Sequence, residues 1–265
     1  MTPAFDPRTT LARPDLAAQA LEGLLAAERY EPVRSMTCLE PSALVRGRPA
    51  DDAAPVDQLL FGERFDVLET REGWAWGQAA RDGVVGWAPL EVFGEGTVLP
   101  THRVDAINDV LPFNALVRVT AVIGQTAAVE GFGPFPMALL SEIGTFASGP
   151  AHVAERWLGT PWLEAGRTGA GIDGPGLVQQ ALFACGRGCP RQPDLMAQRI
   201  GRGVPLGEVR RGDVILLAEH ALIAVEADEV VHAAPGDQVR REPLHEALTH
   251  LKAQGFGEVL AARRP

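Results

Sequence analysis

Cysteine and histidine can supply a nucleophile, a proton acceptor or a metal ligand, and this chain contains few of them. The sequence holds three cysteines and six histidines in 265 residues. Cys185 and Cys189 stand in a C-x3-C spacing, but no second pair and no flanking histidine completes the four ligands of a structural zinc site. We therefore expect no metal, and we expect no other cofactor. A small, odd number of cysteines is typical of a reducing compartment.

Two histidines, His220 and His232, fall in short β-like runs that follow each other closely in the chain. A single histidine on a strand is most often a hydrogen-bonded structural residue. A pair at strand ends can also line a pocket and exchange protons there. Asp173 stands directly before an apolar helical run, which is the position of a helix N-cap more often than of a catalytic acid.

The elements that must position these residues lie in the C-terminal part of the chain. Residues 16–30 show apolar side chains at helical spacing and predict a short N-terminal helix. From residue 31 to 148 short alternating runs are separated by turn residues, which predicts small β modules. After Gly149 and Pro150, helical runs precede β-like runs, an α+β layout with helices packed on an antiparallel sheet. The predicted segments are 1–30 (helical), 31–98 and 99–149 (β modules), and 150–265 (α+β).

The first β module resembles a bacterial SH3 domain, and the second resembles a degraded copy of one, more by position than by motif. The resemblance rests on Leu59-Phe61-Gly62-Glu63, Gly73-Trp74-Trp76 and Gly86-Trp87. It implies two small SH3-like β-barrels. Tryptophans on such modules can bind ligands, but we expect Trp74, Trp76 and Trp87 to serve in packing.

The last segment resembles the NlpC/p60 family of cell-wall cysteine peptidases, which have a papain-like fold. Its blocks occur in the family's order: Leu158-Gly159-Thr160-Pro161-Trp162 with Gly166-Arg167-Thr168, then Gly171-Ile172-Asp173-Gly174-Pro175-Gly176-Leu177-Val178, then Arg211-Gly212-Asp213-Val214, then His220 to Val225 and His232-Ala233. With the two β modules, the chain looks most like members that cut murein peptides after γ-D-glutamyl residues.

The resemblance assigns His220 to the catalytic base and His232 to the residue that orients it. In such enzymes the cysteine begins a helix, whose N-terminal dipole favours the thiolate. Here that position is Gly174, followed by Pro175, so the helix start is retained and the nucleophile is absent. Cys185 lies about 16 Å further along the helix at 1.5 Å per residue, too far to replace it.

Other positions also depart from the family's pattern. Gln192 and Pro193 stand where an acidic residue helps some members to hold the peptide amine, and Leu222 replaces a glycine after the base histidine. Thr160 and Thr168 flank the expected cleft, but unactivated hydroxyls are weak nucleophiles. The residues expected to line a remaining binding cleft are Trp162, Glu164, Asp173, Pro175, Gln192 and Leu222.

These observations predict an NlpC/p60-like pseudoenzyme that binds a murein-derived peptide or a protein partner in or near the former cleft. Two alternatives stay open: hydrolysis by water that His220 activates, and a purely structural or interaction protein that uses its SH3-like modules. The net charge of −10 argues against binding to nucleic acids or anionic membranes. The first residues show no secretory signal and no apolar run could span a bilayer, so we expect a cytoplasmic protein.

Overall fold

The computed structural model describes residues 5–108 and 110–265. The chain forms two compact units, and each of them consists of two separate stretches of the sequence. One unit ends first at Val104 and resumes over Ala115–Ile143, and the other comprises Asp105–Asn114 and Gly144–Pro265.

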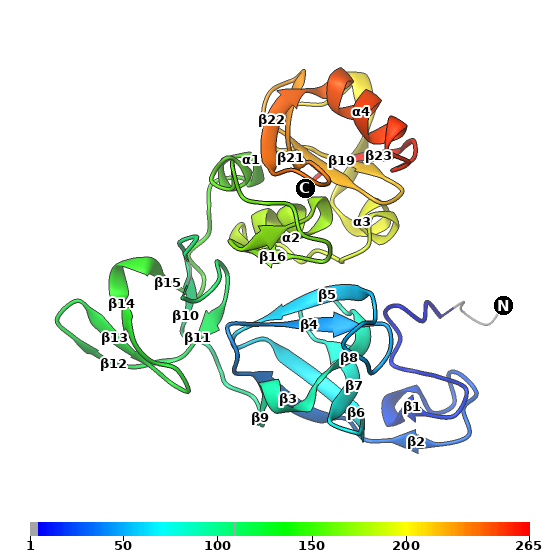
Figure 1. Ribbon diagram of the computed structural model, residues 1–265, viewed down its shortest axis with the longest axis vertical. Helices are drawn as coiled ribbons and strands as arrows, with labels where there is room; N and C mark the ends of the chain where they lie inside the picture. Colours follow the sequence, from blue (N-terminus) through cyan, green and yellow to red (C-terminus); the bar gives the residue numbers. More distant parts are fainter. Residues whose placement is uncertain (1–4, 109) are drawn as a thin grey trace. The chain divides into compact units, whose positions relative to one another are not determined.

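The first unit is built on an antiparallel sheet of seven strands, in the order β5-β4-β8-β7-β6-β3-β9 (Figure 1). The strands are β3 (Arg34–Cys38), β4 (Ser42–Arg46), β5 (Pro55–Leu60), β6 (Arg64–Arg71), β7 (Trp74–Ala79), β8 (Val85–Pro89) and β9 (Phe93–Glu95), with a 3-10 turn η2 (Leu90–Val92). Gly83, with φ 89°, provides the left-handed residue in the Asp82-Gly83 turn between β7 and β8. Among the described residues the sheet is open from β5 to β9, where the sequence predicted a closed barrel.

The N-terminal segment is not the helix that the spacing of its apolar residues predicted. It forms two short parallel strands, β1 (Ala17–Ala18) and β2 (Tyr30–Glu31), around one 3-10 turn, η1 (Gln19–Leu21). Leu11 and Leu16 are buried against Trp76 and Trp87, which have the packing role expected of them. Gly23, with φ 77°, also interrupts the stretch, so burial on the tryptophans and a left-handed glycine outweigh the local helical pattern.

The second β segment forms two small antiparallel sheets. One contains β10 (His102–Val104), β11 (Leu116–Val117) and β15 (Leu140–Glu142). The other contains β12 (Val119–Ile123), β13 (Thr126–Val129) and β14 (Gly133–Pro136), and a 3-10 turn η3 (Met137–Leu139) follows it. Between β10 and β11 the chain leaves to join the second unit, so the predicted 99–149 segment is interrupted.

The second unit combines helices with an antiparallel sheet of six strands, which confirms the predicted α+β class. The sheet order is β18-β23-β19-β20-β21-β22. Its strands are β18 (Arg202–Val204), β19 (Val214–Leu217), β20 (Ala221–Ala224), β21 (Glu229–Ala233), β22 (Val239–Pro243) and β23 (Val259–Arg264). The helices are α1 (Pro150–Glu155), α2 (Gly174–Ala184), α3 (Pro193–Arg199) and α4 (Leu244–Ala253), with η4 (Leu206–Glu208) and the hairpin β16 (Arg167–Thr168) and β17 (Gly171–Ile172).

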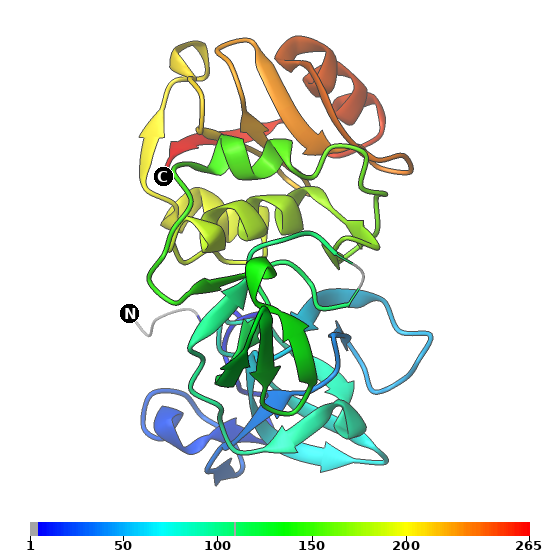
Figure 2. The same ribbon diagram turned by 90° about the vertical axis from the view of Figure 1, so that its left-hand side faces the viewer.

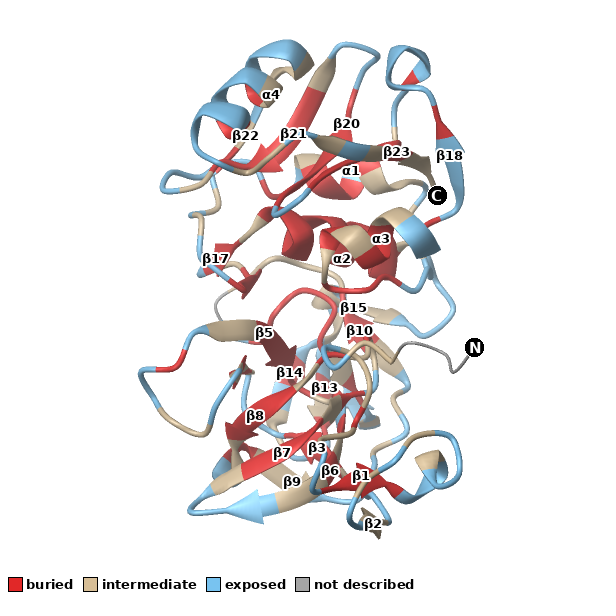
Figure 3. Ribbon diagram, turned by 90° about the vertical axis from the view of Figure 1, so that its right-hand side faces the viewer, coloured by how far each residue is buried: buried red, intermediate tan, exposed pale blue. Residues whose placement is uncertain are grey.

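Alternating side chains on the central strands give the sheet two apolar faces. On β20, Ala221 and Ile223 pack in the core shared with α1 and α2, which lie side by side (Figure 2). Leu222 and Ala224 pack in a second core with α4. Every residue of α2 is buried (Figure 3). The residue just before β20, His220, therefore lies beside a helix that has no exposed face.

No helix in the described part of the chain is both long and apolar enough to cross a bilayer.

Candidate active site

The start of α2 is fixed by Asp173, which caps the helix as the sequence predicted. Its Oδ1 accepts a hydrogen bond from the backbone N–H of Gly176 at 2.7 Å, and its Oδ2 accepts one from Ala165 at 2.9 Å. Pro175, in the first turn, has no N–H to satisfy and has a φ suited to a helix. These local features keep the first residue of the helix, Gly174, in a defined place.

A buried ion pair ties this helix start to the loop that follows α2. Arg191 is 5% exposed and donates to both carboxylate oxygens of Asp173, at 2.9 and 2.5 Å. The pair adds a charge-assisted bidentate contact to the cap. Both oxygens of Asp173 therefore have protein partners, and a contact of Asp173 with a ligand stays a prediction.

Gly174 lies directly against His220, as the sequence predicted. A Cβ built on Gly174 would lie 2.6 Å from Cε1 and 2.8 Å from Nδ1 of His220, and 2.7 Å from the carbonyl oxygen of Ala221. Carbon atoms of side chains do not approach other atoms so closely, so the backbone here leaves no room for a side chain. The imidazole occupies the space that a nucleophile on residue 174 would need.

His220 begins a chain of hydrogen bonds that runs into the sheet. Its Nε2 lies 3.1 Å from Nδ1 of His232, whose Nε2 lies 2.5 Å from Oε1 of Glu242. Arg240 also donates to Glu242, at 3.1 Å. Both histidines are 1% exposed. We call His220, His232 and Glu242 the imidazole relay.

Burial sets the protonation of the imidazole relay. It lowers the pKa of His220 well below the usual value, and the neighbouring His232 lowers it further. Burial also lowers the pKa of His232, although the bond to Glu242 opposes this. Burial alone would raise the pKa of Glu242, but its bonds to His232 and Arg240 leave it lowered. Both imidazoles are thus neutral beside an ionised carboxylate at pH 7.

The tautomers of the two histidines in the imidazole relay follow from their neutral charge and from the carboxylate of Glu242. Glu242 can only accept, so His232 carries its proton on Nε2 and accepts at Nδ1. His220 must then donate from Nε2, which leaves the lone pair of its Nδ1 toward Gly174. The Nδ1 lone pair of His220 therefore faces residue 174, which is a glycine and has no side-chain proton to transfer.

Glu242 is the relay residue that sequence reasoning missed. It lies on β22, where His232 of β21 pairs with Arg240. Because alternate residues share a face of a strand, Glu242 falls on the same face as Arg240, one pleat along. In the sequence, Glu242 stands two residues after Arg240. This spacing identifies it as a neighbour of His232 only when the pairing of the two strands is known.

The other residues predicted to line a cleft are not all brought together. Trp162 is half-buried on the core of α2, and Glu164 is exposed in the loop before β16. Gln192 precedes α3 and is half-buried, and its Oε1 has no hydrogen-bond partner among the described residues. Leu222 has no exposed surface and packs on the α4 face, away from Gly174.

The two cysteines of the C-x3-C spacing lie away from the relay. Cys185 is the C-cap of α2, at the opposite end of the helix from Gly174, about 16 Å along its axis. Cys189 is buried, and its Sγ lies 3.3 Å from the carbonyl oxygen of Pro190. Among the described residues no group of three or more histidine, cysteine or acidic side chains is arranged to hold a metal ion.

Comparison with known proteins agrees with this arrangement. Residues 45–91 match the bacterial dipeptidyl-peptidase SH3 domain, and residues 159–256 match the NlpC/P60 family. No curated protein matches the chain in sequence at a significant level.

Solved structures resemble the chain over most of its length. An NlpC/P60 family protein from Bacillus cereus ATCC 10987 superposes with a TM-score of 0.71 at 16% identity, covering 87% of this chain and 99% of its own. NlpC2 and NlpC1 from Trichomonas vaginalis superpose with a TM-score of 0.45 each, at 16% and 15% identity. They cover 88% and 98% of this chain and 99% and 98% of their own. At 16% identity, the likeness to the Bacillus cereus structure supports the fold of this chain and nothing further.

The capped helix, the histidine at the start of β20 and the order of the matched blocks lead to one assignment. Residues 159–256 form an NlpC/P60 domain, and a bacterial SH3 domain, matched over residues 45–91, precedes it.

Proposed function

We propose that this protein is a catalytically inactive NlpC/P60 pseudoenzyme that recognises a murein-derived peptide beside the former active site. The observation that carries the proposal is the contact between Gly174 and His220. A cysteine peptidase of this fold needs a thiolate at the start of α2. Here the position has no side chain, and the imidazole and the Ala221 carbonyl fill the space beside it.

Burial of the base supports the same proposal. His220 is 1% exposed, so bulk water and a scissile carbonyl have little access to its Nδ1. General-base catalysis requires a reacting group within hydrogen-bond distance of the base. The protein retains an oriented base without a nucleophile and without an open approach to it.

Peptide recognition is proposed for the outer side of this region. Glu164 presents an exposed carboxylate in the loop before β16. A carboxylate suits the amine and N–H groups of a short peptide. The half-buried indole of Trp162 offers an apolar surface in the same loop as Glu164.

Turnover and binding can be measured separately. The full chain is incubated with γ-D-glutamyl murein tripeptides, and new amines are quantified by mass spectrometry. We expect no release above a buffer control, and the same result for His220→Ala. Calorimetry with the same peptide should show binding that Glu164→Gln weakens several-fold and that Glu219→Gln, an exposed control, leaves unchanged.

A second candidate function is slow hydrolysis by water that His220 activates. The observation in its favour is the Nδ1 lone pair that the relay directs toward Gly174. Hydrolysis of the murein peptide that is lost in His220→Ala would establish this function and refute the pseudoenzyme. Absence of both turnover and peptide binding would refute peptide recognition and leave the structural role.

A further inference from the structure

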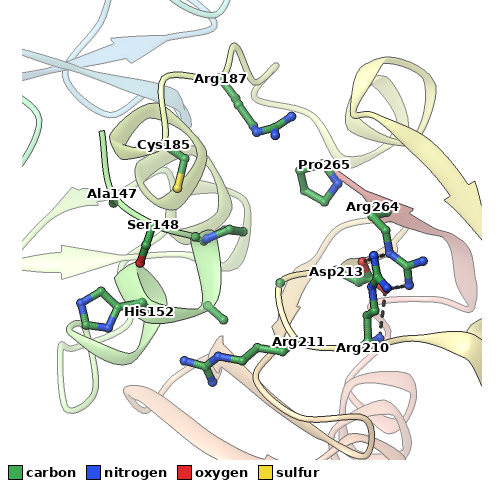
Figure 4. Close-up of a pocket in the computed structure, with 14 residues that line it drawn as sticks. Ala147, Ser148, His152, Cys185, Arg187, Arg210, Arg211, Asp213, Arg264 and Pro265 are labelled. Carbon is green, nitrogen blue, oxygen red and sulfur yellow. Dashed lines mark hydrogen bonds and ion pairs between the residues drawn. The ribbon is translucent and has the colours of Figure 1, made fainter. Parts of the chain in front are cut away.

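The C-terminal end of α2 borders a cavity that has no part in the relay. The cavity has a volume of about 620 Å3 and lies between the start of α1, the end of α2, the turn before β19 and the end of β23. Figure 4 shows Arg187, Arg211, Arg264 and His152 around it. Its size is that of a site for a small organic molecule.

Four arginines line this cavity: Arg187, Arg210, Arg211 and Arg264. We call it the arginine cavity. The chain as a whole carries 24 basic and 34 acidic residues. The protein as a whole has a net negative charge, so the four guanidinium groups make this cavity locally more positive than the rest of the protein. Such a hollow attracts anions.

Two of the four arginines have their charge balanced by the protein. Arg264 donates to both carboxylate oxygens of Asp213, at 2.8 and 2.6 Å. Arg211 donates to both oxygens of Glu155, at 2.9 and 2.7 Å. Asp213 is the acidic side chain in the lining, and it is buried at 1% exposure.

The side chains of Arg187 and Arg210 have no carboxylate partner in the part of the chain that the structure describes. Arg187 follows α2 and Arg210 precedes β19, so the two guanidinium groups come from separate elements that line one cavity. Two unbalanced positive charges that face one hollow match an anion with about two negative charges. A phosphate monoester has a charge of about −1.5 to −2 at pH 7 and three strong acceptor oxygens.

We propose that the arginine cavity binds a phosphorylated small molecule, with Arg187 and Arg210 on the phosphate group. Guanidinium groups bind both carboxylates and phosphates in pairs of parallel hydrogen bonds, but the third acceptor oxygen and the higher charge of a phosphate let it bind two arginines at once. The remaining volume accommodates the organic part of the ligand. This site is independent of the proposed recognition of murein peptides, because it lies at the other end of α2.

Calorimetry and thermal shift test this site with inorganic phosphate, pyrophosphate and glycerol 3-phosphate as probes, and with citrate as a carboxylate control whose negative charge is at least as high as that of a phosphate monoester. The full chain is used at low ionic strength. We expect the phosphate compounds to bind and to raise the melting temperature. The double variant Arg187→Ala/Arg210→Ala should weaken binding at least tenfold, and Arg199→Ala/Arg202→Ala, two exposed arginines outside the cavity, should not.

Three results would overturn the proposal: no binding of any phosphate probe, equal loss in the two double variants, or citrate binding as tight as that of the phosphate compounds. All four arginines in these variants are exposed, so the folded state should be retained, and circular dichroism checks this. Neither variant touches the relay, so loss of phosphate binding leaves the turnover and peptide experiments unaffected.

Discussion

Gly174 occupies the first turn of a helix, where replacement of glycine by alanine ordinarily stabilises a protein by about 0.5–1 kcal/mol. The surroundings reverse that expectation here. A Cβ would overlap the His220 ring and the Ala221 carbonyl. We expect Gly174→Ala to lower the free energy of unfolding by about 1–3 kcal/mol, the usual cost of overpacking. Denaturation in urea measures the change.

The matched control for this substitution is Gly188→Ala. Gly188 is exposed, and a Cβ there would meet no atom within 4 Å. We expect a change within ~0.5 kcal/mol, as for other surface substitutions. Gly174→Cys should lose stability as Gly174→Ala does and should not gain peptidase activity. A stable and active cysteine variant would show that the site opens readily, contrary to the packing argument.

His220 and His232 also make stability depend on pH. The folded pKa of each is below the usual 6.5, so the unfolded chain binds more protons as the pH falls below that value. Stability is therefore lost on acidification from pH 7.5 to 5.5. We expect His220→Asn to show a smaller loss over this interval than the wild type, because one of the two buried groups no longer titrates. Urea denaturation at both pH values measures it.

The exposed histidine His245 provides the control for the pH experiment. Its side chain is 81% exposed, so His245→Asn should leave the loss between pH 7.5 and 5.5 as it is in the wild type. Glu242, whose pKa is lowered, loses its contribution at more acidic pH and does not affect this comparison. An equal loss in His220→Asn and the wild type would contradict the assignment of buried neutral imidazoles.

At the scale of elements, α2 depends on the contacts of Asp173. Asp173→Ala removes the N-cap and also the carboxylate to which Arg191 donates two hydrogen bonds. A lost cap costs about 1 kcal/mol, and breaking a buried ion pair costs about 3–5 kcal/mol. We expect a loss of ~3 kcal/mol or more by urea denaturation. Asp173→Asn retains a capping oxygen and should lose less, and equal losses in the two variants would show that the cap contributes nothing.

The same helix shows which contacts the sequence could predict. Asp173, Gly174 and Pro175 are adjacent, so their residue types alone indicate a capped helix start. The partner Arg191 lies 18 residues away beyond a loop. Nothing in the spacing indicates that this loop returns to the helix start. Local capping was predictable because it depends on neighbours in sequence, and the ion pair was not.

The N-terminal segment shows the opposite outcome at the scale of elements. The apolar residues of 16–30 have helical spacing, yet Leu16 is buried at 1% exposure against tryptophans of the β-sheet. Arg13, just before it, places its guanidinium carbon 4.0 Å from the ring centroid of Trp76. These partners are about 60 residues away in sequence. The spacing of apolar residues within 16–30 cannot indicate contacts with these distant tryptophans. Tertiary packing therefore determined the structure of this segment.

At the scale of the whole molecule, the sequence predicted segment boundaries near residues 30, 98 and 149, whereas the chain folds into two compact units that each combine separate stretches of the sequence. Asp105–Asn114 belongs with the unit that carries the relay. Phe113 is 1% exposed and lies edge-on to Trp157, with ring centroids 5.7 Å apart. Asn114 donates to the backbone carbonyl of Gln180 on α2 at 2.9 Å. A short segment between strands therefore completes the core of the NlpC/P60 domain.

Phe113→Ala tests this arrangement by hydrogen exchange of the full chain. Truncating a buried phenylalanine costs about 3–5 kcal/mol of folding free energy. This loss of stability should fall on the second unit, which contains Phe113. We expect amides of α1 and α2 to lose protection, while the sheet of β12, β13 and β14 retains it. Phe135→Ala, at an equally buried residue of β14, should give the reverse pattern. If Phe113→Ala instead exposed β12–β14 and spared α2, residues 105–114 would belong to the SH3-like part, as the sequence boundary implied.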